Sequence, residues 1–188
     1  MFENMTARFL LWAGYGSRSI QTNQRQFRAA SDAIEDLIGT GSEAALVGRR
    51  PISASPGITP VMRSWSAYMT VDHVNGVHEA MLALIPQLEA GRNPDIGDIS
   101  RFDHPADCGP EVMPRFRDLA SRVIDLPQAY ALTGRGSFVH PIFGRLNSRG
   151  TFALLAFHLH LHVHRFVAAS ASTLERVRKP LPLRRQCR

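Results

Sequence analysis

The stretch from Phe152 to Ala169 reads FALLAFHLHLHVHRFVAA and decides how the C-terminal part of the chain folds. Its middle, His158 to His164, alternates histidine with an apolar residue, which on its own is typical of a β-strand. The flanks favour a helix, because residues 151–156 and 165–171 are rich in Ala and Leu without alternation. The whole stretch is also too long for a typical strand. We therefore expect a helix from an N-cap at Asn147 to about Leu174.

The rest of the chain has three further helical patterns and little strand signal. Apolar residues recur at three- and four-residue steps in each, and Pro- and Gly-rich connections separate them. The expected helices span residues 22–38, 66–89 and from 111 or 114 to about 124, with a short piece at 43–47. This pattern predicts an all-α protein, a four-helix bundle with long connecting loops. We expect an irregular N-terminal lead-in at 1–20, the bundle at 21–174 and a basic C-terminal tail at 175–188.

Length and composition fit an ordinary soluble domain. The chain has 188 residues, of which 44% are hydrophobic and 20% are charged, so one domain with a substantial core is expected. Two cysteines, Cys108 and Cys187, are too few for a disulfide scaffold and lack CxxC spacing, which favours a reducing compartment. Four histidines and Arg165 argue against a membrane span over residues 152–169. We expect a cytoplasmic protein with no membrane partner.

Positive charge is concentrated at the C-terminus. Lys and Arg number 22 against 16 Asp and Glu, for a net charge of +6, and Lys179 is the sole lysine. Between Glu175 and Arg188 there are six basic residues and one acidic residue. Such a tail is usually a solvated terminus, so nucleic-acid contact through it is the weakest of the functions we consider.

Helical geometry divides the four clustered histidines into two pairs. At about 100° per residue, His158 and His162 fall on the side of the polar residues Thr151 and Arg165, while His160 and His164 fall on the apolar side. We therefore expect the first pair at the surface and the second pair pointing inward. Buried imidazoles need partners for their ring nitrogens, and either core hydrogen bonds or a divalent metal would supply them.

A third inward histidine is expected on the helix at 66–89. His73 lies at the edge of its apolar face, whereas His78 lies towards its polar side and Asp72 points away from His73. His73, His160 and His164 would then form a three-imidazole metal site between facing helices. Three protein ligands leave a position open for water or substrate, as catalytic metal sites do.

Four short motifs follow one another along the chain in a particular order. They are Trp65-Ser66, His73-Val74, the segment His140-Pro141-Ile142-Phe143-Gly144-Arg145-Leu146, and His160-x-x-x-His164-Arg165. Together they resemble the DinB-like superfamily of metal-binding four-helix bundles, and the third is similar to a largely uncharacterised branch of it. The resemblance covers about Thr22 to Ala169. Where the family usually has Gln two residues after the Arg, this chain has Val167.

The resemblance implies a divalent metal, zinc or nickel, on His73, His160 and His164. It also implies a metal-dependent S-transferase or isomerase that activates a low-molecular-weight thiol as co-substrate and acts on a small molecule. A homodimer through helix faces is common in that family. The sequence shows no general base, so a non-catalytic bundle, in which the triad binds metal for stability or binds nothing, is the alternative.

Other reactive side chains give weaker evidence of a functional site. His140 is either an ordinary loop residue before Pro141 or a residue that lines the mouth of a pocket, and the sequence leaves both interpretations open. Cys108 lies in a Pro- and Gly-rich loop with no identifiable base, so we expect an inert thiol. Neither a phosphate-binding Gly-rich loop nor a GxSxG elbow is present in the sequence.

Overall fold

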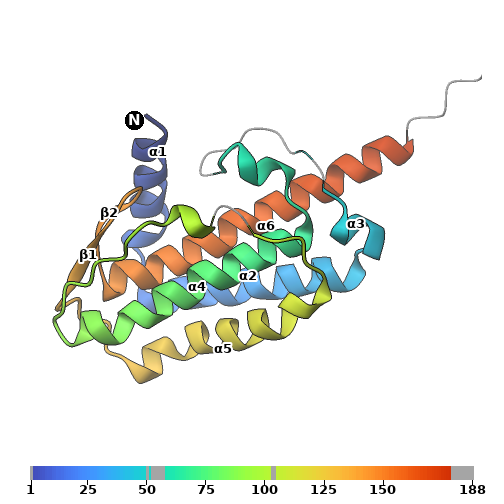
Figure 1. Ribbon diagram of the computed structural model, residues 1–188. Helices are drawn as coiled ribbons and strands as arrows, with labels where there is room; N and C mark the ends of the chain where they lie inside the picture. Colours follow the sequence, from blue (N-terminus) through green and yellow to red (C-terminus); the bar gives the residue numbers. More distant parts are fainter. Residues whose placement is uncertain (1, 50, 52–57, 103–104, 179–188) are drawn as a thin grey trace, which may run out of the picture.

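Four long helices form the body of the protein, seen in a computed structural model (Figure 1). The structure describes residues 2–49, 51, 58–102 and 105–178. The bundle helices are α2 Ile20–Thr40, α4 Ala67–Glu89, α5 Met113–Ala129 and α6 Ser148–Arg178. Helix α6 packs against α2 and α4, and α5 packs against the same two helices, so the four close into a ring. The predicted four-helix bundle is confirmed, and the short piece predicted at 43–47 is α3 Glu43–Val47.

Helix direction explains the long connection between α4 and α5. In Figure 1 both helices run towards the end of the bundle that carries the β-hairpin, while α2 and α6 run the opposite way. Two neighbouring helices that share a direction must be joined by a segment that returns along the bundle. Residues 90–112 are that segment, and they include the 3-10 turns η3 Ser100–Phe102 and η4 Pro110–Val112. A further 3-10 turn, η2 Val61–Ser64, precedes α4.

Capping side chains set where the helices begin. Ser66 Oγ accepts a hydrogen bond from the Met69 amide at 3.1 Å, and Asn147 Oδ1 accepts one from the Gly150 amide at 2.8 Å. Each satisfies an N–H that has no partner within its helix. The predicted N-cap at Asn147 is confirmed. Helix α5 runs to Ala129, beyond the predicted end near residue 124, although Pro127 cannot donate a backbone hydrogen bond; Leu126 of its last turn is buried and anchors it.

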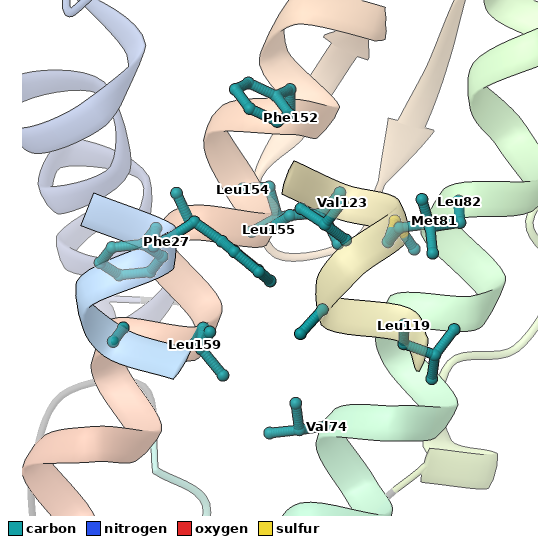
Figure 2. Packing of buried hydrophobic residues seen from close by; sticks show 14 of the residues in the cluster. Phe27, Val74, Met81, Leu82, Leu119, Val123, Phe152, Leu154, Leu155 and Leu159 are labelled. Carbon is teal, nitrogen blue, oxygen red and sulfur yellow. The ribbon is translucent and has the colours of Figure 1, made fainter. Parts of the chain in front are cut away.

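The core lies where the four bundle helices face one another. Figure 2 shows Phe27 of α2, Val74 of α4, Leu119 of α5 and Leu159 of α6 converging on this space. Helix α6 is buried on every side over residues 151–157, each at most 8% exposed. A helix enclosed in this way has no solvent-facing side over these two turns.

The N-terminal segment is helical where the sequence predicted an irregular lead-in. Helix α1 spans Phe2–Leu11, and a π-helical turn, η1 Trp12–Gly16, follows it. Leu11 and Tyr15 are buried, and the Tyr15 ring packs edge-on against Phe157 at 5.5 Å. The prediction of an irregular segment was wrong because two buried residues in so short a segment do not produce a helical repeat of apolar positions that the sequence pattern could reveal. The bundle limits at 21 and 174 stay a prediction.

A two-stranded hairpin lies in the connection between α5 and α6, where the sequence predicted a long loop. Strand β1 Ser137–His140 pairs antiparallel with β2 Gly144–Asn147, and His140 opposes Gly144. The Gly136 amide donates to the Leu88 carbonyl at 2.8 Å, which seats the hairpin against the end of α4. A Cβ at Gly136 would lie 2.1 Å from the Arg92 carbonyl oxygen, so only glycine fits there. Strands of four residues are too short for alternation to stand out in the sequence.

The C-terminal end of the chain extends α6 past the bundle (Figure 1). The helix reaches Arg178 rather than ending near Leu174. Residues 179–188, which hold most of the basic tail, lie outside the described residues. Among the described residues, no helix is both long and apolar enough to cross a membrane.

Candidate metal centre

Three histidines from two helices meet beside the core. His73 of α4 and His158 and His162 of α6 place ring nitrogens within 4.8 Å of one another. The Nε2 atom of His158 lies 3.2 Å from Nε2 of His73 and 3.2 Å from Nε2 of His162. Three nitrogens that bind one tetrahedral zinc, each at about 2.0–2.1 Å, lie about 3.3 Å apart. The spacing therefore fits a divalent ion held by three imidazoles.

Contacts behind the rings determine how they face the cluster. The Nδ1 atom of His73 lies 2.7 Å from the carbonyl oxygen of Phe102, which accepts only, so Nδ1 carries the proton and Nε2 presents a lone pair. The Nδ1 atom of His158 lies 3.4 Å from Nε2 of His78. Phe102 belongs to the segment that returns along the bundle, and a Cβ at Gly76 of α4 would lie 3.1 Å from its ring. The bundle topology therefore orients the His73 ring.

Hydrogen bonds cannot satisfy both Nε2–Nε2 contacts of His158 at once. With Nε2 of His73 unprotonated, a proton between His73 and His158 must come from Nε2 of His158. That same nitrogen would then have to share its proton with Nε2 of His162, or else accept one from it and leave the His73 contact without a proton. A neutral cluster thus places a proton along only one of the two 3.2 Å contacts. A metal ion would accept all three lone pairs.

Burial keeps the imidazoles near this centre neutral. Shielding from water lowers the pKa of His158 well below its usual 6.5, and the neighbouring His162 and His73 lower it further by repulsion. Burial also lowers the pKa of His78 to about 3, with a smaller contribution from His73. Neutral imidazole is the form that binds metal ions, so His158 is in the form that can ligate a cation at neutral pH.

The α6 pair in this cluster is the pair that was predicted to lie at the surface. His162 is 1% exposed and His158 is partly buried, whereas His160, predicted to point inward, is exposed. The structure therefore does not bring His160 to the cluster. The side chain of His164 lies outside the described residues.

The prediction assigned the faces of α6 wrongly because it used polar residues, Thr151 among them, to mark a solvent-facing side. Thr151 is fully buried, and its hydroxyl donates to the Asn147 carbonyl at 2.8 Å, so this polar residue needs no contact with water. Both histidine pairs have the same four-residue spacing, and residues 151–157 are buried all round. The local sequence thus held no signal that would select His158 and His162.

His78 was also misplaced by the sequence. It was predicted to lie towards the polar side of α4, but it is 1% exposed, and its ring packs against Phe27 at 5.6 Å. The cause is again burial on several sides, because α4 is covered by α5, α6 and the returning segment. His78 therefore lies directly behind His158 and contacts it, which sequence reasoning missed.

A cavity of about 120 Å³ opens beside the cluster. His73, His158 and His162 line it, and His140 of the hairpin also lines it. Of the two interpretations of His140, the structure favours a place at the pocket. Most of the remaining wall is apolar and includes Val77, Met81, Phe143, Leu154, Phe157 and Leu161.

Cys108 contributes no nucleophile to this site. Burial raises the pKa of its thiol to about 11, and the nearby carboxylates of Asp72 and Glu111 raise it further. The thiol therefore stays protonated at neutral pH, in agreement with the expectation that it is inert.

Comparison with known proteins supports the fold. The crystal structure of TT2238, a four-helix bundle protein, matches this chain with a TM-score of 0.54 and 17% sequence identity, covering 80% of this chain and 99% of that one. At such low identity the match shows the fold alone. No family model and no curated protein matches the sequence. The chain is thus a four-helix bundle with a histidine cluster that could bind a metal ion.

Proposed function

We propose that this protein binds a divalent metal through His73, His158 and His162 and uses it to activate a small thiol. The convergence of three Nε2 atoms at a spacing suited to one ion is the observation that carries the metal site. The resemblance of the sequence to DinB-like proteins favours zinc or nickel and a low-molecular-weight thiol. This ligand set replaces the α6 pair His160 and His164, because His160 is exposed.

A bound divalent metal would supply one chemical effect, namely a lower pKa for a thiol that ligates it, which yields the more nucleophilic thiolate. The protein's own residues supply the setting. Three neutral imidazoles contribute no negative charge, so the centre favours an anionic further ligand such as a thiolate. The apolar walls of the cavity keep water away from that ligand and leave room for a small molecule.

The ligand set is tested by the metal content of protein purified without a polyhistidine tag. We expect about one equivalent of metal in the wild type and almost none in His158→Ala or His162→Ala, because each removes one of only three protein ligands. His73→Ala should behave in the same way. His160→Ala and His164→Ala are the matched controls on the same helix and should retain the metal. Loss of metal from these two, with retention in His158→Ala, would establish the set predicted from sequence instead.

A non-catalytic metal site is the second candidate, and the apolar character of the cavity favours it, because few polar groups there could assist a reaction. The two candidates differ in a thiol-transfer assay with the metal-loaded protein and several small thiols. Turnover that disappears in His162→Ala supports the enzyme. A large metal-dependent rise in melting temperature without turnover supports the structural role.

Nucleic-acid contact through the basic tail is a third and weaker proposal, supported by charge alone. Removing residues 179–188 and measuring DNA affinity at several salt concentrations tests it. An affinity that is unchanged by the truncation would exclude the tail as the binding element.

A further inference from the structure

His140 is held in one orientation at the turn of the hairpin. Its Nδ1 atom accepts hydrogen bonds from the backbone amides of Ile142 at 3.1 Å and Phe143 at 3.3 Å. Its ring also packs against the Phe143 ring, with centroids 4.9 Å apart. Gly144, opposite His140 in the register, has a φ of +76°, which glycine adopts without strain and which lets the turn close.

These two amides determine the tautomer of His140. An amide N–H donates only, so Nδ1 must present its lone pair, and the single proton of the neutral ring is on Nε2. Burial lowers the pKa of His140 to about 4, so the ring is neutral at neutral pH. His140 is therefore a fixed donor with its N–H on the nitrogen away from the turn.

The cavity offers this donor no protein partner. No hydrogen bond to Nε2 of His140 is formed within the described part of the chain. Thr59 lines the same cavity, and its buried hydroxyl has no hydrogen-bond partner among the described residues. A buried hydroxyl without a partner, such as that of Thr59, costs free energy unless something pairs with it. A ligand with a hydrogen-bond acceptor that enters the cavity would pair with the Nε2–H of His140.

We infer that His140 donates a hydrogen bond from Nε2 to a carbonyl or carboxylate oxygen of a small, largely apolar molecule bound in this cavity. The inference rests on the proposed function for its setting, because the same cavity reaches the three-histidine cluster. It identifies the substrate class as a small carbonyl compound and assigns His140 to recognition of its oxygen.

Two substitutions separate the roles of the two ring nitrogens. His140→Asn keeps an acceptor where Nδ1 meets the Ile142 and Phe143 amides but removes the donor at Nε2. His140→Gln places an amide N–H near the position of Nε2 but removes that acceptor. The first variant therefore tests the donor in an intact hairpin, and the second tests whether any donor at that place suffices.

The probes are methyl mercaptoacetate, which carries a carbonyl, and n-pentanethiol, a similar chain without one. Binding is followed by the visible absorption of the cobalt-loaded protein. We expect His140→Asn to bind methyl mercaptoacetate about fivefold more weakly than wild type, with n-pentanethiol affinity unchanged, because one neutral hydrogen bond is lost. His140→Gln should retain the preference for the ester. Equal weakening of both probes in His140→Asn, or no weakening, would overturn the inference.

Failure of the metal site would be visible separately, since no cobalt spectrum would then appear in the wild type. The inference is decided in that case by ¹⁵N-resolved NMR of His140 in the metal-free protein. We expect the proton on Nε2, and a shift of that N–H signal when methyl mercaptoacetate is added. A proton on Nδ1, or an unmoved signal at saturating probe, would contradict the proposed donor.

Discussion

At the scale of single residues, the candidate site depends on which nitrogen of each imidazole carries the proton. The carbonyl of Phe102 orients His73, and His78 stands behind His158 in the same way. A ring held from behind loses less freedom when it binds a metal, and its binding nitrogen is more basic. The residues that do not contact the ion are thus part of the site.

His78→Phe tests the contact behind His158. The substitution keeps an aromatic ring packed against Phe27 but removes the nitrogen 3.4 Å from Nδ1 of His158. We expect metal affinity to fall roughly 10- to 100-fold, measured by competition with a chromophoric chelator. The matched control is His160→Phe, at an exposed position of α6, which should bind metal as the wild type does. Equal affinities for the two variants would show that His78 does not support the ligand.

At the scale of elements, α4 carries His73 and starts only six residues before it. The start of that helix is held by the Ser66 hydroxyl, which is buried and accepts the Met69 amide at 3.1 Å. A cap so close to a ligand links helix stability to the site. Fraying of the first turn of α4 would move Trp65, whose ring packs against the His73 ring at 5.0 Å.

Ser66→Ala should cost about 1 kcal/mol of unfolding free energy, because an amide of the first turn loses its partner. Urea denaturation measures this. Ser42→Ala is the matched control, since Ser42 stands at the N-cap of α3 but makes no side-chain capping hydrogen bond, and it should change stability by less than about 0.5 kcal/mol. A similar loss from both substitutions would contradict the capping role of Ser66.

At the scale of the whole molecule, buried neutral histidines make the fold sensitive to acid. The folded pKa values of His78, about 3, and His140, about 4, lie below the usual 6.5. Between these values the unfolded chain binds protons that the folded chain does not. The stability is therefore fully present above about pH 6.5 and is lost as the pH falls below it.

As the pH falls from 6.5 to 5, the unfolding free energy of the metal-free protein should fall increasingly steeply, by up to about 1.4 kcal/mol per pH unit for each such histidine. Urea midpoints measured across this range test the slope. His140→Asn should flatten it by about one proton, because one buried imidazole is removed. An unchanged slope in that variant would mean that His140 is protonated equally in the folded and unfolded chain.

The four bundle helices and α3 could be predicted from the sequence alone, because hydrophobic period and capping residues are local properties. The pattern from residue 22 to 38 became α2, Ser66 marked the start of α4, and Asn147 marked the start of α6. It also identified His73 and the histidine-rich stretch of α6 as candidate ligands. Short elements with few anchors, α1 and the hairpin, lay below what periodicity can detect.

Which histidines meet depends on how the helices pack together. Helix α6 is enclosed by α2, α4 and the N-terminal helices, so the usual contrast between an apolar and a polar face is absent over residues 151–157. The direction in which α4 lies from α6 then selects His158 and His162, and that direction is a property of the assembled bundle. The same holds for Phe102 and His140, which reach the site from segments distant in sequence because the connections of the bundle return across it.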